Sequence, residues 1–121
     1  MIVTMPARFD LVTLTPPSTG RLADFYAAAL DLVEVEREDG DRWVVLADRH
    51  GVRRLGFQRG PHRAGGVHLD LVVSGDELDR EVDRLVALGA ELAAAVRGEP
   101  YGRIANLIDP AGNELDLVAY E

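Results

Sequence analysis

Cysteine is absent from this sequence, which excludes disulfide bonds, a thiolate nucleophile and zinc–thiolate sites. Positive charge is scarce, because 21 Asp and Glu residues outnumber 13 Lys and Arg residues and give a formal net charge of −8. No basic stripe is present to neutralise phosphates, so we expect no nucleic-acid partner. Long apolar runs and the basic start of a secretory signal are also missing. We therefore expect a cytoplasmic location and no membrane partner.

Nucleotide fingerprints, phosphate loops and nucleophile motifs are missing as well. Their absence argues against nicotinamide chemistry, phosphoryl transfer and acyl transfer. The sequence does contain enough apolar material for a core, because 47% of its 121 residues are hydrophobic. This length and composition predict one globular domain over residues 1–121.

The first half predicts a strand, a helix and three further strands. Residues 9–14 are mostly apolar and precede two prolines, which is typical of a strand that ends there. Ser18 or Thr19 then begins a helix whose apolar residues follow helical spacing: Leu22, Phe25, Tyr26, Ala29 and Leu30. Turn residues separate the three strands that we expect next, at 33–38, 42–47 and 54–58.

The second half predicts the same order of elements. A strand at 67–73 leads to Ser74 and Glu77, which have the spacing of a capping box. An amphipathic helix follows and ends at Gly89. Three strands are then expected, at 91–97, 103–108 and 114–119.

This internal repeat, over about 8–59 and 66–120, is the most informative feature of the sequence. One helix per half covers only one face of each sheet. We therefore predict an α+β fold: two β-α-β-β-β modules that form a curved mixed sheet around a cavity, with the helices on the outside.

The last predicted hairpin carries two acidic residues on one strand face. Its turn, 109–113, has the Asp-Pro and Gly-Asn pairs of strong turn chemistry. Along the strand that follows, alternation places Glu114, Asp116 and Val118 on one face. Carboxylates on an otherwise buried strand indicate either a polar cavity or a bound cation.

The whole chain resembles the vicinal oxygen chelate superfamily, which comprises glyoxalase, bleomycin-resistance and extradiol-dioxygenase proteins. The resemblance depends on the doubled element order and on four segments: RLADFYAAALDL, HLDLVV, LVALGAEL and DPAGNELDLV. It implies that the chain binds a small molecule between its sheets. A fold of this kind hosts many activities, so the activity has to come from the site.

In metal-dependent members of that superfamily, each half supplies one ligand from its first strand and one from its last strand. Carried over by resemblance, His68 and Asp116 match the two ligands of the second half. Gln58 or Gly56 takes the ligand position on the last strand of the first half. On the first strand, Leu11 removes the ligand in one register, and Asp10 supplies it in the other. The metal set implied by the resemblance is therefore His68, Asp116, Gln58 and Asp10, and it is incomplete.

Candidate ligand-binding residues are apolar, aromatic or able to form hydrogen bonds. The set comprises Trp43, Phe57, Tyr101, Arg103 and Asn106. Core packing is the alternative for each aromatic residue, and a surface ion pair is the alternative for Arg103. Asn106 is flanked by apolar residues, and a buried amide needs a partner.

Three functions follow from these residues. The first is a protein that binds a small, partly apolar molecule, as bleomycin-resistance relatives do, without a complete metal site. The second is a metal-dependent lyase, isomerase or dioxygenase that acts on vicinal oxygens with a divalent ion as cofactor. The third is a metal-free enzyme in which His68 is the catalytic residue and transfers protons. In each case we expect a homodimer, since two open sheets leave strand edges to protect.

Overall fold

The computed structural model describes residues 9–120. The first module contains β1 (Val12–Leu14), α1 (Thr19–Leu30), β2 (Val33–Glu38), β3 (Trp43–Ala47) and β4 (Arg53–Gln58). The second module contains β5 (His68–Val72), a single turn of 3-10 helix (Gly75–Glu77), α2 (Leu78–Leu88), β6 (Glu91–Leu92), β7 (Arg97–Glu99), β8 (Gly102–Ile108) and β9 (Glu114–Tyr120). No helix within the described residues is long and apolar enough to cross a membrane.

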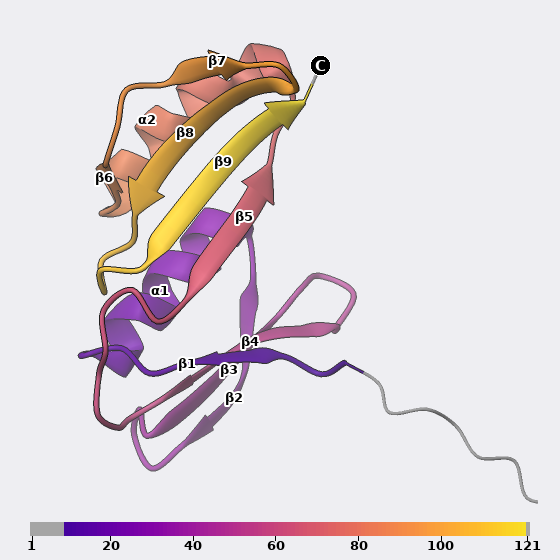
Figure 1. Cartoon of the computed structure of the whole chain (residues 1–121). Helices are drawn as coiled ribbons and strands as arrows, with labels where there is room; N and C mark the ends of the chain where they lie inside the picture. Colours follow the sequence, from indigo (N-terminus) through magenta and orange to yellow (C-terminus); the bar gives the residue numbers. More distant parts are fainter. Residues whose placement is uncertain (1–8, 121) are drawn as a thin grey trace, which may run out of the picture.

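Each module forms its own mixed sheet, and the two sheets share one connectivity. The first sheet has the order β1-β4-β3-β2, and the second has the order β5-β9-β8-β6, with β7 also paired to β8. In both sheets the first strand of the module lies parallel to the last strand, and the remaining pairs are antiparallel. Figure 1 shows the second sheet above the first, with α2 behind the second sheet. The predicted α+β fold of two β-α-β-β-β modules is confirmed.

Three local features differ from the sequence prediction. The strand expected at 91–97 is split into β6 and β7, because the intervening run is rich in alanine, which has low strand propensity. β1 begins only at Val12. Ser74 makes no side-chain cap; instead its carbonyl accepts the Glu77 backbone N–H at 2.9 Å, so the predicted capping box is wrong.

One hydrophobic core joins the two modules on the helix side of the sheets. It contains residues of both helices and of both sheets, among them Leu22, Tyr26, Leu46, Phe57, Leu85, Leu107, Leu115 and Leu117. Along β9, alternation sends Leu115 and Leu117 into this core and turns Glu114 and Asp116 to the opposite face. We call that opposite face of the second sheet the helix-free face.

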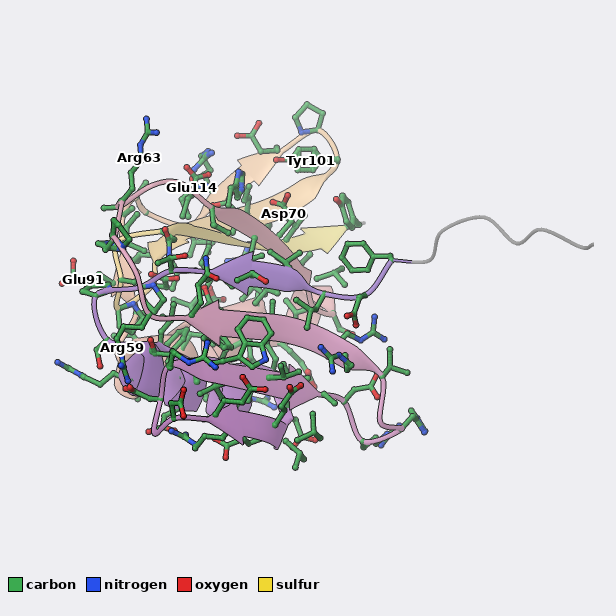
Figure 2. The ribbon with its side chains drawn as sticks, turned by 90° about the horizontal axis from the view of Figure 1, so that it is seen from below. Arg59, Arg63, Asp70, Glu91, Tyr101 and Glu114 are labelled. Atoms are coloured by element: carbon green, nitrogen blue, oxygen red, sulfur yellow. The ribbon has the colours of Figure 1, made fainter. Side chains whose placement is uncertain are left out.

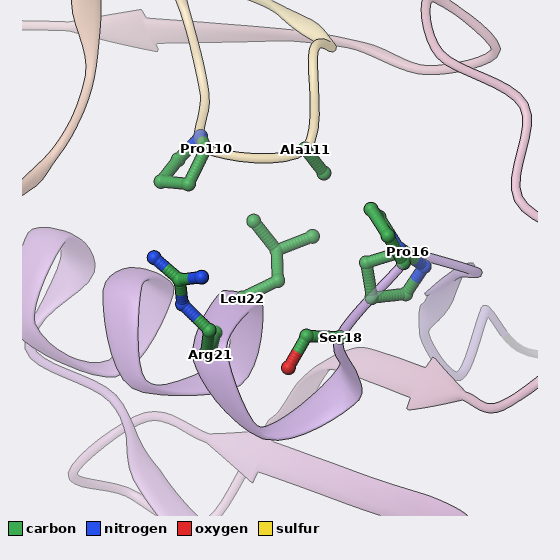
Figure 3. Close-up of a pocket in the computed structure, with 7 residues that line it drawn as sticks. Pro16, Ser18, Arg21, Leu22, Pro110 and Ala111 are labelled. Carbon is green, nitrogen blue, oxygen red and sulfur yellow. The ribbon is translucent and has the colours of Figure 1, made fainter.

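The turn between β8 and β9 packs against the start of α1. Pro110 and Ala111 lie opposite Leu22, Arg21 and Ser18, and with Pro16 and Pro17 these residues enclose a small pocket of about 120 Å³ (Figure 3). In the same turn, Asp109 Oδ2 accepts a hydrogen bond from the buried Tyr26 hydroxyl of α1 at 2.7 Å. The second module is therefore fixed to the first through its last turn.

Candidate functional site

Four side chains from β5 and β9 meet on the helix-free face. His68 Nε2 lies 2.8 Å from Asp116 Oδ2 and 3.2 Å from both Asp70 Oδ1 and Glu114 Oε2. Three carboxylates thus surround one ring nitrogen. We call these four residues the His68 cluster. Figure 2 shows two of them, Asp70 and Glu114, in the upper part of the view from below.

Strand pairing explains why these residues meet. β5 and β9 are parallel, and their register pairs His68 with Glu114 and Asp70 with Asp116. Within each strand the members lie two residues apart, so all four side chains leave the sheet on one face. The intervening Leu69 and Leu115 pack on the core side and fix this orientation.

The His68 cluster has a buried base and an open rim. The Asp116 side chain is 7% exposed, whereas that of His68 is 48% exposed and that of Asp70 is 71% exposed. A cation or ligand can therefore reach the cluster from solvent, while Asp116 is held inside the protein. Its carboxylate needs partners, because burying an unpaired charge is costly.

The charges of the cluster shift the protonation of two members. Partial desolvation lowers the pKa of His68, but the hydrogen bond to Asp116 and the charges of Asp70, Glu114 and Asp116 outweigh it and raise this pKa overall. Contact with Asp116 also raises the pKa of Glu114, by hydrogen bonding and by charge repulsion, against the opposing effect of His68. Both shifts have the same cause, an excess of negative charge in one place.

A line of polar contacts continues from Asp116 across the sheet. Asn106 Nδ2, on β8, donates to Asp116 Oδ1 at 2.7 Å. The Arg97 guanidinium, on β7, donates to Asn106 Oδ1, and its Nε donates to Glu99 Oε1 at 2.9 Å. The cluster is thus connected to three further residues on the same face.

The sequence-predicted metal ligands fall into two groups. His68 and Asp116 are in direct contact. The other two lie on the first sheet with different partners: Asp10 forms an ion pair with Arg53 at 3.0 Å, and Gln58 Nε2 donates to Thr15 Oγ1 at 3.0 Å. Within the described residues, neither has a hydrogen bond or ion pair to the cluster. The alternative position, Gly56, lies directly under the Trp43 ring.

The predicted ligand-binding residues are dispersed over the molecule. Phe57 is fully buried on the core side and stacks on Tyr26 with ring centroids 6.1 Å apart. Tyr101 is exposed and packs against Tyr120, and Arg103 forms an ion pair with Asp79 at 2.9 Å. Of the predicted set, Asn106 alone has a hydrogen bond to a member of the cluster.

From the sequence, Asp70 and Glu114 were expected beside His68 and Asp116 as a network that needs no metal, not as metal ligands, and Arg97 was not singled out. The signal for the first two was present, because each is two residues from a predicted ligand on the same strand face. Arg97 could not have been found in this way, since the predicted strand at 91–97 is split in the structure.

The donor set of the His68 cluster fits a divalent cation. His68, Asp70 and Asp116 each offer one ligand atom, and these atoms lie within 4.8 Å of one another. Imidazole nitrogen combined with carboxylate oxygen suits Mn²⁺, Fe²⁺ and Zn²⁺, and the accessible rim leaves room for a substrate.

The family of this chain follows from its sequence and its fold together. A sequence model described as glyoxalase-like domain matches residues 11–118. The paired β-α-β-β-β modules support the vicinal oxygen chelate superfamily, since a solved glyoxalase/bleomycin resistance protein/dioxygenase family enzyme shares this fold. The chain belongs to the glyoxalase-like domain family within that superfamily. Among curated proteins, none matches the sequence.

Solved structures of low sequence identity share the fold. A glyoxalase/bleomycin resistance protein/dioxygenase family enzyme from Burkholderia phytofirmans PsJN is 20% identical with a TM-score of 0.77, over 93% of this chain and 98% of the other. A glyoxalase-related enzyme from Fulvimarina pelagi is also 20% identical with a TM-score of 0.75, over 93% and 87%. A variant of the fosfomycin resistance protein FosX from Listeria monocytogenes, complexed with Mn(II) and a dihydroxypropylphosphonic acid, is 17% identical with a TM-score of 0.76, over 97% and 93%.

Proposed function

We propose that this chain binds one divalent cation at the His68 cluster and, through it, a small molecule with neighbouring oxygen atoms. The observation that carries the proposal is the approach of three carboxylates to within 3.2 Å of the same ring nitrogen. Of the functions that the sequence left open, this geometry favours the metal-dependent one.

The electrostatics of the cluster support a cation rather than a metal-free pocket. When ionised, the three carboxylates carry three negative charges, and a protonated His68 neutralises only one of them. Like charges at this spacing repel, and one of them lies on a buried side chain. A divalent cation bound to neutral His68 would reduce the net charge of the cluster from −3 to −1 and would accept one oxygen of each carboxylate as a ligand.

The chemistry of such a site is Lewis-acid catalysis. A bound divalent ion polarises substrate oxygens, which suits a lyase, isomerase or dioxygenase acting on vicinal oxygens. The fold relative FosX supports this class, because its structure contains both Mn(II) and a dihydroxylated phosphonic acid. In this chain, Asp116 and His68 would hold the ion. The exposed Asp70 and Glu114 would either coordinate it as further ligands or be displaced from it by substrate oxygens.

We also propose that the protein is a homodimer whose partner covers the site. The His68 cluster is open to solvent, and β5, which carries half of it, is an edge strand. Exposed apolar residues continue on the same face, at Val72 and Tyr120. Covering an edge strand and excluding water from a metal site are both achieved by a second copy. Sedimentation equilibrium at micromolar concentration is expected to give a dimer, and a monomer would contradict this part of the proposal.

Metal binding is the direct test. Protein prepared with chelator and then dialysed is titrated with Mn²⁺, Fe²⁺, Ni²⁺ or Zn²⁺ by calorimetry, and one ion per chain is expected. Asp116→Asn and His68→Ala should each weaken binding at least tenfold, since the first removes an anionic ligand and the second removes the imidazole ligand. Asp83→Asn is the matched control, because Asp83 is an exposed aspartate on α2. Absence of binding for all four ions would favour a metal-free binding protein instead, and unchanged binding by Asp116→Asn would mean that the bound ion lies outside the His68 cluster.

A further inference from the structure

Asp116, Asn106 and Arg97 form a directed chain of hydrogen bonds behind the His68 cluster. β9 and β8 pair Asp116 with Asn106, so the two side chains stand next to each other on the helix-free face. Asn106 donates to Asp116 Oδ1, and Arg97 donates to Asn106 Oδ1. Glu99 in turn accepts from Arg97 and holds the guanidinium in place.

The direction of this chain is fixed by chemistry. A guanidinium has donors and no acceptor, so the end of the Asn106 amide that faces Arg97 must be its oxygen. The opposite end, which faces Asp116, is then the NH₂ group. An ionised carboxylate only accepts hydrogen bonds, so both contacts are satisfied in this one orientation. Without Arg97, only the contact with Asp116 would hold the Asn106 amide in this orientation.

This orientation determines what Asp116 can offer to a cation. Its Oδ1 is engaged by Asn106 at 2.7 Å, and its Oδ2 points at His68 at 2.8 Å. The side chain is almost completely buried, so it has little water to replace a lost donor. Because the aspartate side chain is short, it cannot compensate for a rotation of its carboxylate, and such a rotation would move Oδ2 away from His68.

We propose that Asn106 and Arg97 are positioning residues for the metal site: Arg97 orients the Asn106 amide, and Asn106 holds Asp116 with one oxygen directed at the cation. This inference rests on the metal site proposed above and concerns residues that do not themselves touch the ion. Both ends of the Asn106 amide are used within the protein, which gives this residue a role distinct from contact with a ligand.

Arg97 allows the proposal to be separated from simple electrostatics. The guanidinium is a positive charge near a cation site, so its removal should strengthen cation binding if charge alone matters. Positioning predicts the opposite sign. In the calorimetric titration with Mn²⁺, Arg97→Ala and Asn106→Ala are expected to weaken binding by roughly 10- to 100-fold, as for other groups that orient a metal ligand. Arg97→Lys keeps a donor and should recover most of the affinity. Arg80→Ala, which removes a charge from the exposed face of α2, should leave binding unchanged.

The outcomes are distinguishable from failure of the metal site itself. Equal or tighter Mn²⁺ binding by Arg97→Ala would overturn the positioning role, as would binding within twofold of the original by Asn106→Ala. If the original protein binds no metal, the side-chain amide signal of Asn106 in a ¹⁵N-resolved NMR spectrum tests whether Arg97 orients this amide. A downfield amide proton that is lost in Arg97→Ala and kept in Arg97→Lys would support the orientation, and an unchanged signal would overturn it. Arg97 is exposed, so its variants are expected to fold.

Discussion

Two buried aspartates near the end of the chain differ in their partners. Asp109 accepts hydrogen bonds from Tyr26, from the backbone N–H groups of Ala111 and Asn113, and from the Asn113 side chain. Its carboxylate is fully occupied and fixes a turn. Asp116 is equally buried, but it accepts from Asn106 and faces His68 and two other carboxylates. The four donors to Asp109 indicate a structural role, whereas the excess of acceptors around Asp116 makes it a candidate ligand.

Tyr26→Phe is expected to lower the free energy of unfolding by about 2 kcal/mol at neutral pH, because it leaves a buried carboxylate short of one donor. Burial, the hydrogen bond to Asp109 and the Asp109 charge raise the pKa of Tyr26 far above its ordinary value. The folded state therefore keeps this hydroxyl protonated, while the unfolded state ionises it above about pH 10.

The sign of the pH effect follows from that difference. A raised folded pKa contributes stability that is complete below the unfolded pKa and is lost as pH rises above it. Tyr26→Phe lacks this contribution, so the stability gap between the two proteins should shrink by about 1.4 kcal/mol at pH 11. Urea unfolding followed by the fluorescence of Trp43, at pH 8 and pH 11, measures the gap. A gap that stays constant over this range would show that Tyr26 does not titrate on unfolding.

At the level of elements, the sequence predicted most of the fold and named two of the four residues of the candidate site, His68 and Asp116, as metal ligands. Periodicity located both helices and most strands, because one face of each must be apolar to pack on a shared core. The pairing of His68 with Asp116 came from the resemblance. The Arg97–Asn106 contact could not be predicted from the sequence, because it depends on how β7 and β8 are aligned after an alanine-rich break. Contacts between distant loops and helices leave no local periodicity.

Arg84 illustrates such a contact between elements. α1 ends at Leu30, so the carbonyls of its last turn lack helical partners. Arg84, on α2, donates to the carbonyl oxygens of Ala28 at 3.1 Å and Ala29 at 2.6 Å, and Glu81 supports the guanidinium. A cation at a helix C-terminus is also favoured by the helix dipole. One helix therefore caps the other.

We expect Arg84→Ala to lower the free energy of unfolding by about 1 kcal/mol, a value reduced by the partial exposure of the side chain. Arg84→Lys keeps the charge but cannot bridge two carbonyls as a planar fork, so it should lose about half as much. Arg80→Ala, on the same helix, should change stability by less than about 0.5 kcal/mol. Equal losses for Arg84→Ala and Arg80→Ala in urea titrations would mean that the capping contacts contribute nothing.

At the scale of the whole molecule, the two modules share one core. Side chains from both helices and from both sheets belong to this one hydrophobic core. The sheet that carries the His68 cluster therefore depends on the packing of the first module, although β1 to β4 contribute no side chain to that cluster. Sharing a core makes unfolding of one module costly without the other, which is the condition for cooperative behaviour.

Leu85→Ala tests this coupling across the molecule. Leu85 is buried on α2 in the second module, whereas Trp43, the single tryptophan, lies on β3 in the first. Truncating a buried leucine costs roughly 2–5 kcal/mol, because it removes apolar contact and leaves a cavity. If the modules unfold together, the free energy of unfolding reported by Trp43 fluorescence should fall by that full amount, as a lower urea midpoint with an unchanged slope. Leu88→Ala, on the same helix but exposed, should shift the midpoint little. A Trp43 transition that stays at its original midpoint in Leu85→Ala would mean that the first module unfolds independently, and the His68 cluster would then depend on the second module alone.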